Sequence, residues 1–128
     1  MDQVYETERL IIRPTMVEDA AFILALMNTP KWIQNIGDRK VRTLKDAENY
    51  IKEKMYPQLE SHGYSNCTMI TKSSKEKIGT CGLYHREGLD HVDIGFALIP
   101  DFERKGYAYE AASKMLNLGF NTFGLKQI

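Results

Sequence analysis

Residues 93–120 read D-I-G-F-A-L-I-P-D-F-E-R-K-G-Y-A-Y-E-A-A-S-K-M-L-N-L-G-F. The first part alternates large apolar residues with small or polar ones, which predicts a strand that Pro100 ends. From residue 108 onward, small and apolar residues recur at three- and four-residue spacings, as on one face of a helix. They are Ala108, Ala111, Ala112, Met115, Leu116 and Gly119. The stretch therefore predicts a strand, a loop and a helix in direct succession.

The loop between this strand and this helix has the features of an anion site. The first backbone N–H groups of a helix have no partners within the helix, and the helix dipole favours negative charge beside them. Gly106 adds no side chain that would block an approaching anion, while Arg104 and Lys105 add positive charge. On its composition alone, this loop is either a basic surface turn without a ligand or a phosphate-binding loop.

The same loop resembles the acetyl-CoA signature of the GNAT superfamily of N-acetyltransferases, Q/R-x-x-G-x-G/A. Gly106 and Ala108 match its two small positions, whereas Glu103 stands where Gln or Arg is usual. The run K-G-Y-A-Y-E-A is similar to the ribosomal-protein-alanine (Rim-type) branch, as are T-E-R-L-I-I-R-P near the N-terminus and I-G-T-C-G-L-Y in the middle. The resemblance spans nearly the whole chain in order.

This resemblance implies direct transfer of an acetyl group from acetyl-CoA, as co-substrate, to a primary amine of a protein N-terminus or a small molecule. It also implies that the strand pairs with the pantetheine arm and that the N–H of Leu98 polarises the thioester carbonyl. For Tyr107 and Tyr109, packing on the sheet is the alternative to a place along the cofactor. The cofactor-binding residues expected on this basis are Phe96, Ala97, Leu98, Glu103, Arg104, Lys105, Gly106, Tyr107, Ala108 and Tyr109.

Amine acetylation needs a neutral amine, so a proton acceptor is sought near the same strand. Asp93, His85 and His91 are the candidates, and each has the alternative of being an ordinary exposed polar residue. With Leu98, the residues Asp93 and His85 make up the predicted catalytic set. Trp32 is expected either to line an acceptor pocket or to anchor the core.

Composition indicates one ordinary globular domain over residues 1–128. Seventeen basic residues balance seventeen acidic ones, so global charge favours neither nucleic acid nor an anionic membrane as a partner. The sequence has no apolar run of membrane-spanning length and no signal-peptide core, which predicts a cytoplasmic protein. Two cysteines outside any C-x-x-C motif predict reduced thiols, and three histidines without metal-ligand spacing predict no metal site.

The rest of the chain predicts a series of strands and helices typical of an α+β domain. Strands are expected at residues 8–14, 64–71, 77–85 and 91–99, and the segment 31–42 is expected to be irregular. A capping box at residues 15–18 predicts a helix with Ala20, Ile23, Leu26 and Met27 inward. A second helix, beginning at residue 43, should bury Leu44, Ala47, Ile51 and Met55. The order β-α-α-β-β-β-α predicts a layered, mostly antiparallel sheet with helices on both faces, the order of the GNAT fold's N-terminal and central parts.

Residues 124–128 look like a turn that enters another strand, and the GNAT pattern continues there with further strands. We therefore expect the chain to be a C-terminally truncated GNAT-type domain, either a fragment of a longer protein or a homo-oligomer that pairs at the free sheet edge. The unusual Glu103 and the lack of one clear base motivate an alternative function, a non-catalytic acyl-CoA-binding sensor or partner module.

Overall fold

A computed structural model describes residues 3–85 and 92–128 of the chain. The strands are β1 (Tyr5–Glu6), β2 (Leu10–Pro14), β3 (Asn66–Thr71), β4 (Lys77–His85) and β5 (Val92–Leu98). The helices are α1 (Ala20–Met27), α2 (Pro30–Asn35), α3 (Leu44–Tyr50), α4 (Tyr56–His62) and α5 (Tyr107–Asn117). Shorter helical turns are η1 (Val17–Asp19), η2 (Ile51–Met55), η3 (Pro100–Phe102) and η4 (Leu118–Thr122).

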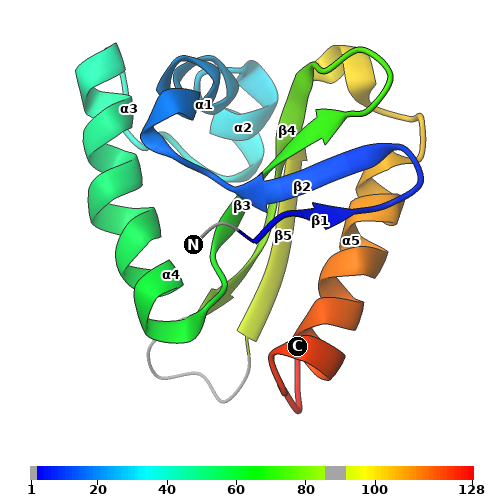
Figure 1. Ribbon diagram of the computed structural model, residues 1–128. Helices are drawn as coiled ribbons and strands as arrows, with labels where there is room; N and C mark the ends of the chain where they lie inside the picture. Colours follow the sequence, from blue (N-terminus) through cyan, green and yellow to red (C-terminus); the bar gives the residue numbers. More distant parts are fainter. Residues whose placement is uncertain (1–2, 86–91) are drawn as a thin grey trace.

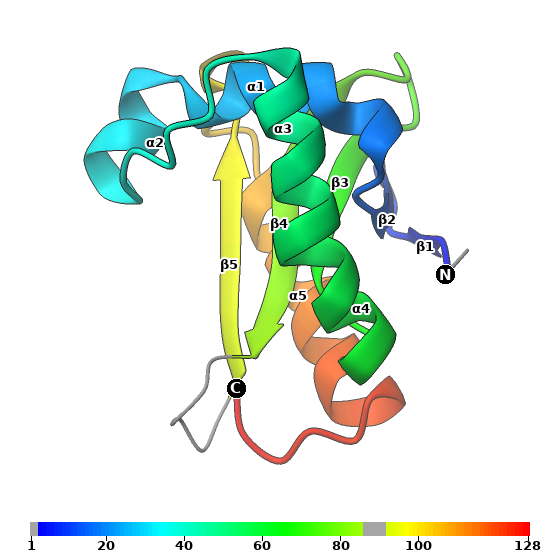
Figure 2. The same ribbon diagram turned by 90° about the vertical axis from the view of Figure 1, so that its left-hand side faces the viewer.

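The strands form one antiparallel sheet in the order β1-β2-β3-β4-β5. Helix α5 lies on one side of this sheet, and helices α1, α3 and α4 lie on the other (Figure 1, Figure 2). The expected α+β fold, a mostly antiparallel sheet with helices on both faces, is thereby confirmed. Because the strands pair in chain order, β1 and β5 are the two edges of the sheet.

The two faces of the sheet differ in chemistry. The face toward α5 is apolar and forms a core with that helix, to which the sheet contributes Leu10, Ile12, Met69, Ile78, Cys81 and Leu83 and the helical segment Ala111, Met115 and Leu118. The opposite face carries polar side chains such as Arg13, Thr68 and Thr80. Helices α1 and α3 therefore build a separate apolar cluster of their own, which contains Ala20, Ile23, Met27, Val41, Ala47, Ile51 and Met55.

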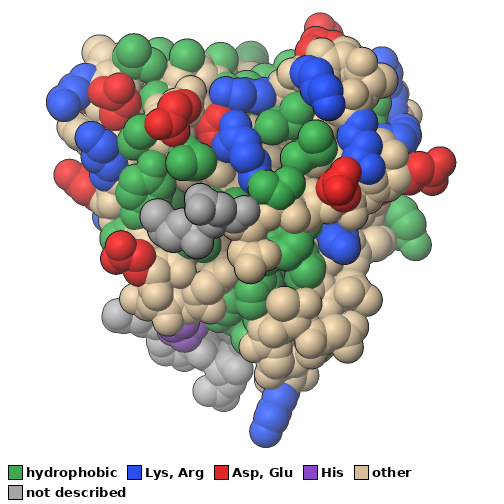
Figure 3. Space-filling model, in the orientation of Figure 1, with side chains coloured by type: hydrophobic (Ala, Val, Ile, Leu, Met, Phe, Trp, Pro, Cys, Tyr) green, Lys and Arg blue, Asp and Glu red, His purple; other side chains and the backbone are tan. Residues whose placement is uncertain are grey.

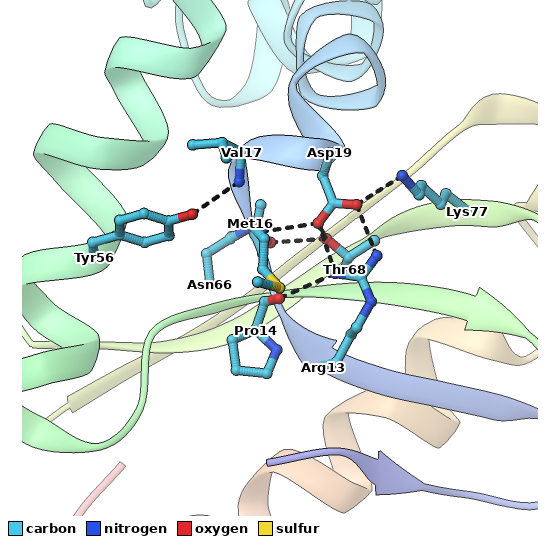
Figure 4. Close-up of polar contacts among 10 residues, drawn as sticks. Arg13, Pro14, Met16, Val17, Asp19, Tyr56, Asn66, Thr68 and Lys77 are labelled. Atoms are coloured by element: carbon cyan, nitrogen blue, oxygen red, sulfur yellow. Dashed lines mark hydrogen bonds and ion pairs between the residues drawn. The ribbon is translucent and has the colours of Figure 1, made fainter. Parts of the chain in front are cut away.

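Asp19 fills the polar layer between the sheet and α1 (Figure 4). Its carboxylate is fully buried and accepts hydrogen bonds from Arg13 Nη1 and Nη2, both at 2.8 Å. Lys77 Nζ lies 2.7 Å from the same carboxylate, and the backbone N–H of Met16 donates to it at 2.9 Å. The expected capping box was therefore misplaced: the acidic partner is Asp19 rather than Glu18, and Thr15 is buried, hydrogen-bonded to Thr68.

Three details of the helices differ from the sequence-based expectations. The segment expected to be irregular contains helix α2, which begins at Pro30 behind a Thr29 cap. Leu44 is 50% exposed, because the packing of α3 on α1 begins only at Ala47. Leu116 is 38% exposed, since it lies about 100° around the helix from the buried Met115.

The last residues do not form a strand but fold back over α5. Gly124 turns the chain at a φ of +71°, and Ile128 packs closely over Gly119. The N–H of Val92 donates to the carbonyl of Gln127 at 3.4 Å. The C-terminal segment thus covers the first residue of β5 and leaves the other end of that strand open (Figure 2).

Charges of both signs lie side by side on the molecular surface in Figure 3, as the balanced composition predicts. Within residues 3–85 and 92–128, no helix is long and apolar enough to cross a membrane. The same residues contain no cluster of three or more His, Cys, Asp and Glu side chains arranged to hold a metal ion. Cys67 and Cys81 are free and buried opposite each other, and burial raises the pKa of Cys67 to about 12.

Candidate active site

The edge of β5 offers free backbone groups in a defined direction. The N–H of Ile99 donates to the carbonyl of Ile78 on β4 at 2.8 Å. Since backbone groups alternate in direction along an antiparallel strand, those of Phe96 and Leu98 point away from β4. Among the described residues, no strand pairs with this side of β5. The strand therefore presents two adjacent positions at which an extended chain could add by hydrogen bonding.

Two cavities meet at this strand. The larger has a volume of about 480 Å³ and lies over the polar face of β3, β4 and β5, with walls from α2, α3, η2 and α4. The smaller has a volume of about 220 Å³ and lies between α2 and the last residues of β5. Their linings share four residues, namely Trp32, Ile36, Phe96 and Ala97. The two cavities are therefore neighbours, and these shared residues form the wall between them.

Glycines make room for the floor of the larger cavity. Gly82 on β4 stands opposite Gly95 on β5; the ring of Tyr84 lies against Gly95 and its hydroxyl against Gly82. The hydroxyl of Tyr84 donates to Asn66 Oδ1 at 2.6 Å, so the ring is held flat along the sheet. Because a methyl group at residue 82 would come within 2.5 Å of the Ser65 carbonyl, a larger residue cannot be accommodated there without a backbone shift.

Helix α2 forms the wall between the cavities. The side chain of Thr29 accepts a hydrogen bond from the Trp32 N–H at 3.3 Å and so fixes the first turn. The indole N–H of Trp32 is buried and has no hydrogen-bond partner among the described residues. Lys31 forms an ion pair with Glu103, which ties α2 to the loop after β5. Glu103, at the position where the signature has Gln or Arg, is therefore engaged with α2.

The loop from η3 to α5 is held in an uncommon conformation. Arg104 has a φ of +62° and Gly106 a φ of +84°, both in the left-handed region. Gly106 is the residue before the first turn of α5, and its carbonyl accepts the N–H of Glu110 at 3.1 Å. The N–H groups of that first turn face outward from the helix end, where the dipole favours an anion.

Arg9 fastens this loop to the N-terminal strands. Its Nε atom lies 2.8 Å from Glu110 Oε1, and its Nη1 donates to the carbonyl of Lys105 at 3.0 Å. The guanidinium also lies 4.2 Å from the ring centre of Tyr107. Glu110 accepts further hydrogen bonds from Thr7 and from the Arg9 N–H. Burial alone would raise the pKa of Glu110, but the hydrogen bonds from Thr7 and Arg9 outweigh it and lower that pKa.

The structure divides the expected cofactor-binding residues into two groups. Phe96, Ala97, Leu98 and Glu103 line the smaller cavity. Arg104, Lys105, Gly106, Tyr107, Ala108 and Tyr109 form the loop and the first turn of α5 and line neither cavity. Tyr107 packs on the core beneath Arg9, whereas Tyr109 is 80% exposed.

The expected proton acceptors lie at the larger cavity. Asp93 stands opposite Tyr84 in the β4–β5 ladder, and both residues line the cavity. His85 lines it as well, and its ring lies 4.3 Å from that of His62. Leu98 lies in the other cavity, at the far end of β5. The third candidate, His91, lies outside the described residues.

Several lining residues escaped the sequence analysis. They are contributed by the loop after α2, by one side of the α3–η2–α4 segment and by two neighbouring strands, namely Arg39, Tyr50, Lys54, Gln58, Asn66 and Tyr84. Tyr50, Lys54 and Gln58 recur every four residues, a spacing that could have indicated one polar helix side facing a common space. No comparable pattern marks Arg39 or Asn66.

Comparison with known proteins gives the family. The acetyltransferase (GNAT) domain matches residues 9–128. Among curated proteins, Uncharacterized N-acetyltransferase YoaA of Bacillus subtilis (strain 168) is 30% identical over 130 residues, which cover 100% of this chain and 72% of the relative.

Solved structures show the same fold. An acetyltransferase from Agrobacterium tumefaciens str. C58 has a TM-score of 0.80 at 23% identity, covering 98% of this chain and 71% of that one. The ribosomal-protein-S5-alanine acetyltransferase from Vibrio fischeri has a TM-score of 0.73 at 16% identity, covering 97% and 70%. Such low identities do not single out the ribosomal-protein-alanine branch. The domain match and the curated relative together establish that the chain belongs to the GNAT family and is an acetyltransferase.

Proposed function

We propose that the protein transfers an acetyl group from acetyl-CoA directly to a primary amine, either a protein N-terminal α-amine or a small-molecule amine. The observation that carries this proposal is the pair of cavities that share a wall at the edge of β5. A transferase of this kind needs one space for the donor and one for the acceptor, with the reacting atoms brought together between them.

The residues at the smaller cavity, together with the loop before α5, fit acetyl-CoA. Its extended, amide-rich arm would pair with the outward backbone groups of Phe96 and Leu98. Its phosphates would be held by the first-turn amides of α5, with the side chains of Arg104 and Lys105 nearby. Gly106 fits this role, because a Cβ atom there would meet Arg9 Nη2 at 3.2 Å in a backbone conformation that L-residues rarely adopt. When bound, acetyl-CoA supplies the acetyl group as an activated thioester.

The outward N–H of Leu98 is our candidate for the donor that stabilises negative charge developing on the acetyl oxygen. A preorganised donor of this kind commonly contributes about 3 kcal/mol to transition-state stabilisation. A backbone group is suited to the task, because the β4–β5 ladder fixes its direction without any side-chain ordering.

We assign proton removal from the amine to residues that line the larger cavity. Asp93 and His85 are the candidates there, and each is fixed by the backbone of a strand. The variants D93N and H85Q show which of the two residues is the proton acceptor. We expect the base variant to lower kcat by about a hundredfold or more while the Kd for acetyl-CoA stays unchanged. If both variants keep kcat, neither residue is the base.

The proposal is tested by calorimetric titration with acetyl-CoA followed by detection of free thiol with a panel of amines. The panel should include an Ala-initiated peptide, lysine and small amines, since the resemblance to the ribosomal-protein-alanine branch favours an α-amine. We expect saturable binding with a Kd between about 1 μM and 1 mM and thiol release with at least one acceptor class. Binding without thiol release for every class would instead favour a non-catalytic acyl-CoA-binding module.

A further inference from the structure

Among the described residues, the charged side chains that line the larger cavity are unequal in sign. Arg39, from the segment between α2 and α3, and Lys54, from η2, are cations. Asp93 is the one carboxylate among the described lining residues. An ammonium or polyamine ligand would therefore meet more positive than negative charge, whereas an anionic group would be attracted.

Neither cation is already neutralised by a described residue. Within residues 3–85 and 92–128, no carboxylate lies within 4.0 Å of the charged nitrogens of Arg39 or Lys54. Neighbouring cations are different: Lys31 is paired with Glu103, and Arg42 lies 2.5 Å from Asp38. Both cations that line the cavity thus have no carboxylate partner among the described residues.

The helical wall of the cavity leaves Lys54 available for a ligand. Gln58, one turn further on, is fully used, because its Nε2 donates to the carbonyls of Tyr64 and Leu83 at 2.9 and 2.8 Å. Its Oε1 accepts the N–H of His85 at 3.2 Å. Gln58 therefore holds the end of β4, and the charged group of this wall is Lys54.

We infer that the acceptor is an amine that also carries an anionic group, a carboxylate or a phosphate, which Arg39 and Lys54 bind. This inference rests on the proposed function, since it names the class of acceptor for the same site. The cavity volume of about 480 Å³ suits a small molecule or the end of a peptide with such a group. Polyamines are correspondingly poor acceptors.

Binding can be measured without turnover, because Trp32 is the only tryptophan of the chain and lines the cavity. Its fluorescence would be titrated with matched amines: β-alanine against β-alaninamide and 1,3-diaminopropane, and O-phosphoethanolamine against ethanolamine. We expect the acidic member of each series to bind with a Kd at least about tenfold lower than its neutral partner, which corresponds to about 1.4 kcal/mol. The two series distinguish carboxylate from phosphate as the preferred group.

Variants assign the effect to the two cations. R39Q and K54Q should each remove most of the preference while leaving the Kd for acetyl-CoA unchanged. K52Q is the matched control, because Lys52 is exposed on the same turn and does not line the cavity. Raising the salt concentration should also weaken the preference, since both cations are exposed to solvent.

The inference and the proposed function fail in different ways. Equal binding of acidic and neutral amines, tighter binding of the diamine, or a preference that survives R39Q and K54Q together would overturn the inference. A clear preference for acidic amines with no thiol release would uphold the recognition of an anion but count against acetyl transfer. Thiol release with preference for the acidic amines supports both.

Discussion

Arg13 binds both carboxylate oxygens of Asp19 at 2.8 Å, and this bidentate pair joins β2 to the turn that precedes α1. Lys77 of β4 approaches the same carboxylate, so three elements from separate parts of the sequence converge on one buried charge. The apolar clusters on the two sides of the sheet do not include these residues. The helices that carry the larger cavity are therefore positioned over the sheet partly by a polar junction.

Replacing Asp19 with Asn should destabilise the fold strongly. The substitution keeps the shape but removes the charge that Arg13 and Lys77 neutralise, and breaking a buried pair commonly costs about 3–5 kcal/mol. Because Arg13 and Lys77 are partly exposed and can regain water, we expect the lower end, about 3 kcal/mol, in urea unfolding. D38N, which breaks the exposed pair with Arg42, should change stability little. Equal effects of the two variants would contradict the assigned role of Asp19.

The same carboxylate predicts acid sensitivity. Burial alone would raise the pKa of Asp19, but hydrogen bonds from Arg13, Lys77 and the Met16 N–H lower it well below its usual range. The folded state thus holds fewer protons than the unfolded state below about pH 4, so the stabilisation is present above that pH and is lost as the pH falls further. Urea midpoints between pH 7 and pH 2.5 should fall more steeply for the native sequence than for D19N. Parallel curves would show that other carboxylates dominate acid unfolding.

Gly106 should be needed for binding of acetyl-CoA. Alanine there must adopt a φ near +84°, which L-residues rarely adopt, with its Cβ 3.2 Å from Arg9 Nη2, so either the guanidinium that holds the loop or the loop itself has to shift. We expect G106A to raise the Kd for acetyl-CoA at least about tenfold in calorimetric titration. G124A is the matched control, because Gly124 has a φ of +71° and open space around it. Both variants should lose similar stability, about 1–2 kcal/mol, while only G106A loses affinity. An unchanged Kd for G106A would exclude the loop as the phosphate site.

Trp32 should contribute to the reaction through its unpartnered indole N–H. W32F removes this donor and keeps an aromatic ring in the wall, so the free energy of unfolding should change by less than about 1 kcal/mol. We expect kcat/KM in the thiol-release assay to fall about tenfold, on the premise that bound substrate supplies the missing partner of this N–H, since Trp32 lines both cavities. Y56F should behave oppositely, with lower stability and unchanged KM, since the Tyr56 hydroxyl accepts the Val17 N–H at 2.9 Å within the fold. An unaltered kcat/KM in W32F would show that the indole N–H of Trp32 does not contribute to the reaction.

Local patterns predicted the sheet and the longer helices well. The period of two gave β4 at residues 77–85 with both of its observed ends, and small residues after Gly106 gave the helix that packs on the sheet. Helix α2 was not foreseen, because six residues are too few to establish a helical period. Its start at Thr29 and Pro30, a common cap and first-turn pair, was the only available signal.

The site could be predicted only where it follows one continuous stretch. The loop from Glu103 to Ala108 was found because the signature lies within a few residues. For the larger cavity, the sequence indicated only Trp32, Asp93 and His85. Other lining residues, such as Lys54 and Tyr84, come from separate elements and meet only through the fold. The junction at Asp19 was missed for the same reason: its partners are 6 residues before it and 58 residues after it. Long-range pairs of this kind leave no spacing for a single sequence to display.

The separate apolar clusters on the two sides of the sheet bear on how the enzyme could diversify. Substitutions in contact with each other couple energetically, whereas substitutions in independent clusters add nearly without interaction. Changes around Arg39 or along the α3–α4 wall would therefore reshape the larger cavity without disturbing the packing of α5. With the proposed assignment of the two cavities, acceptor specificity can thus change on this scaffold while the loop before α5 stays constant.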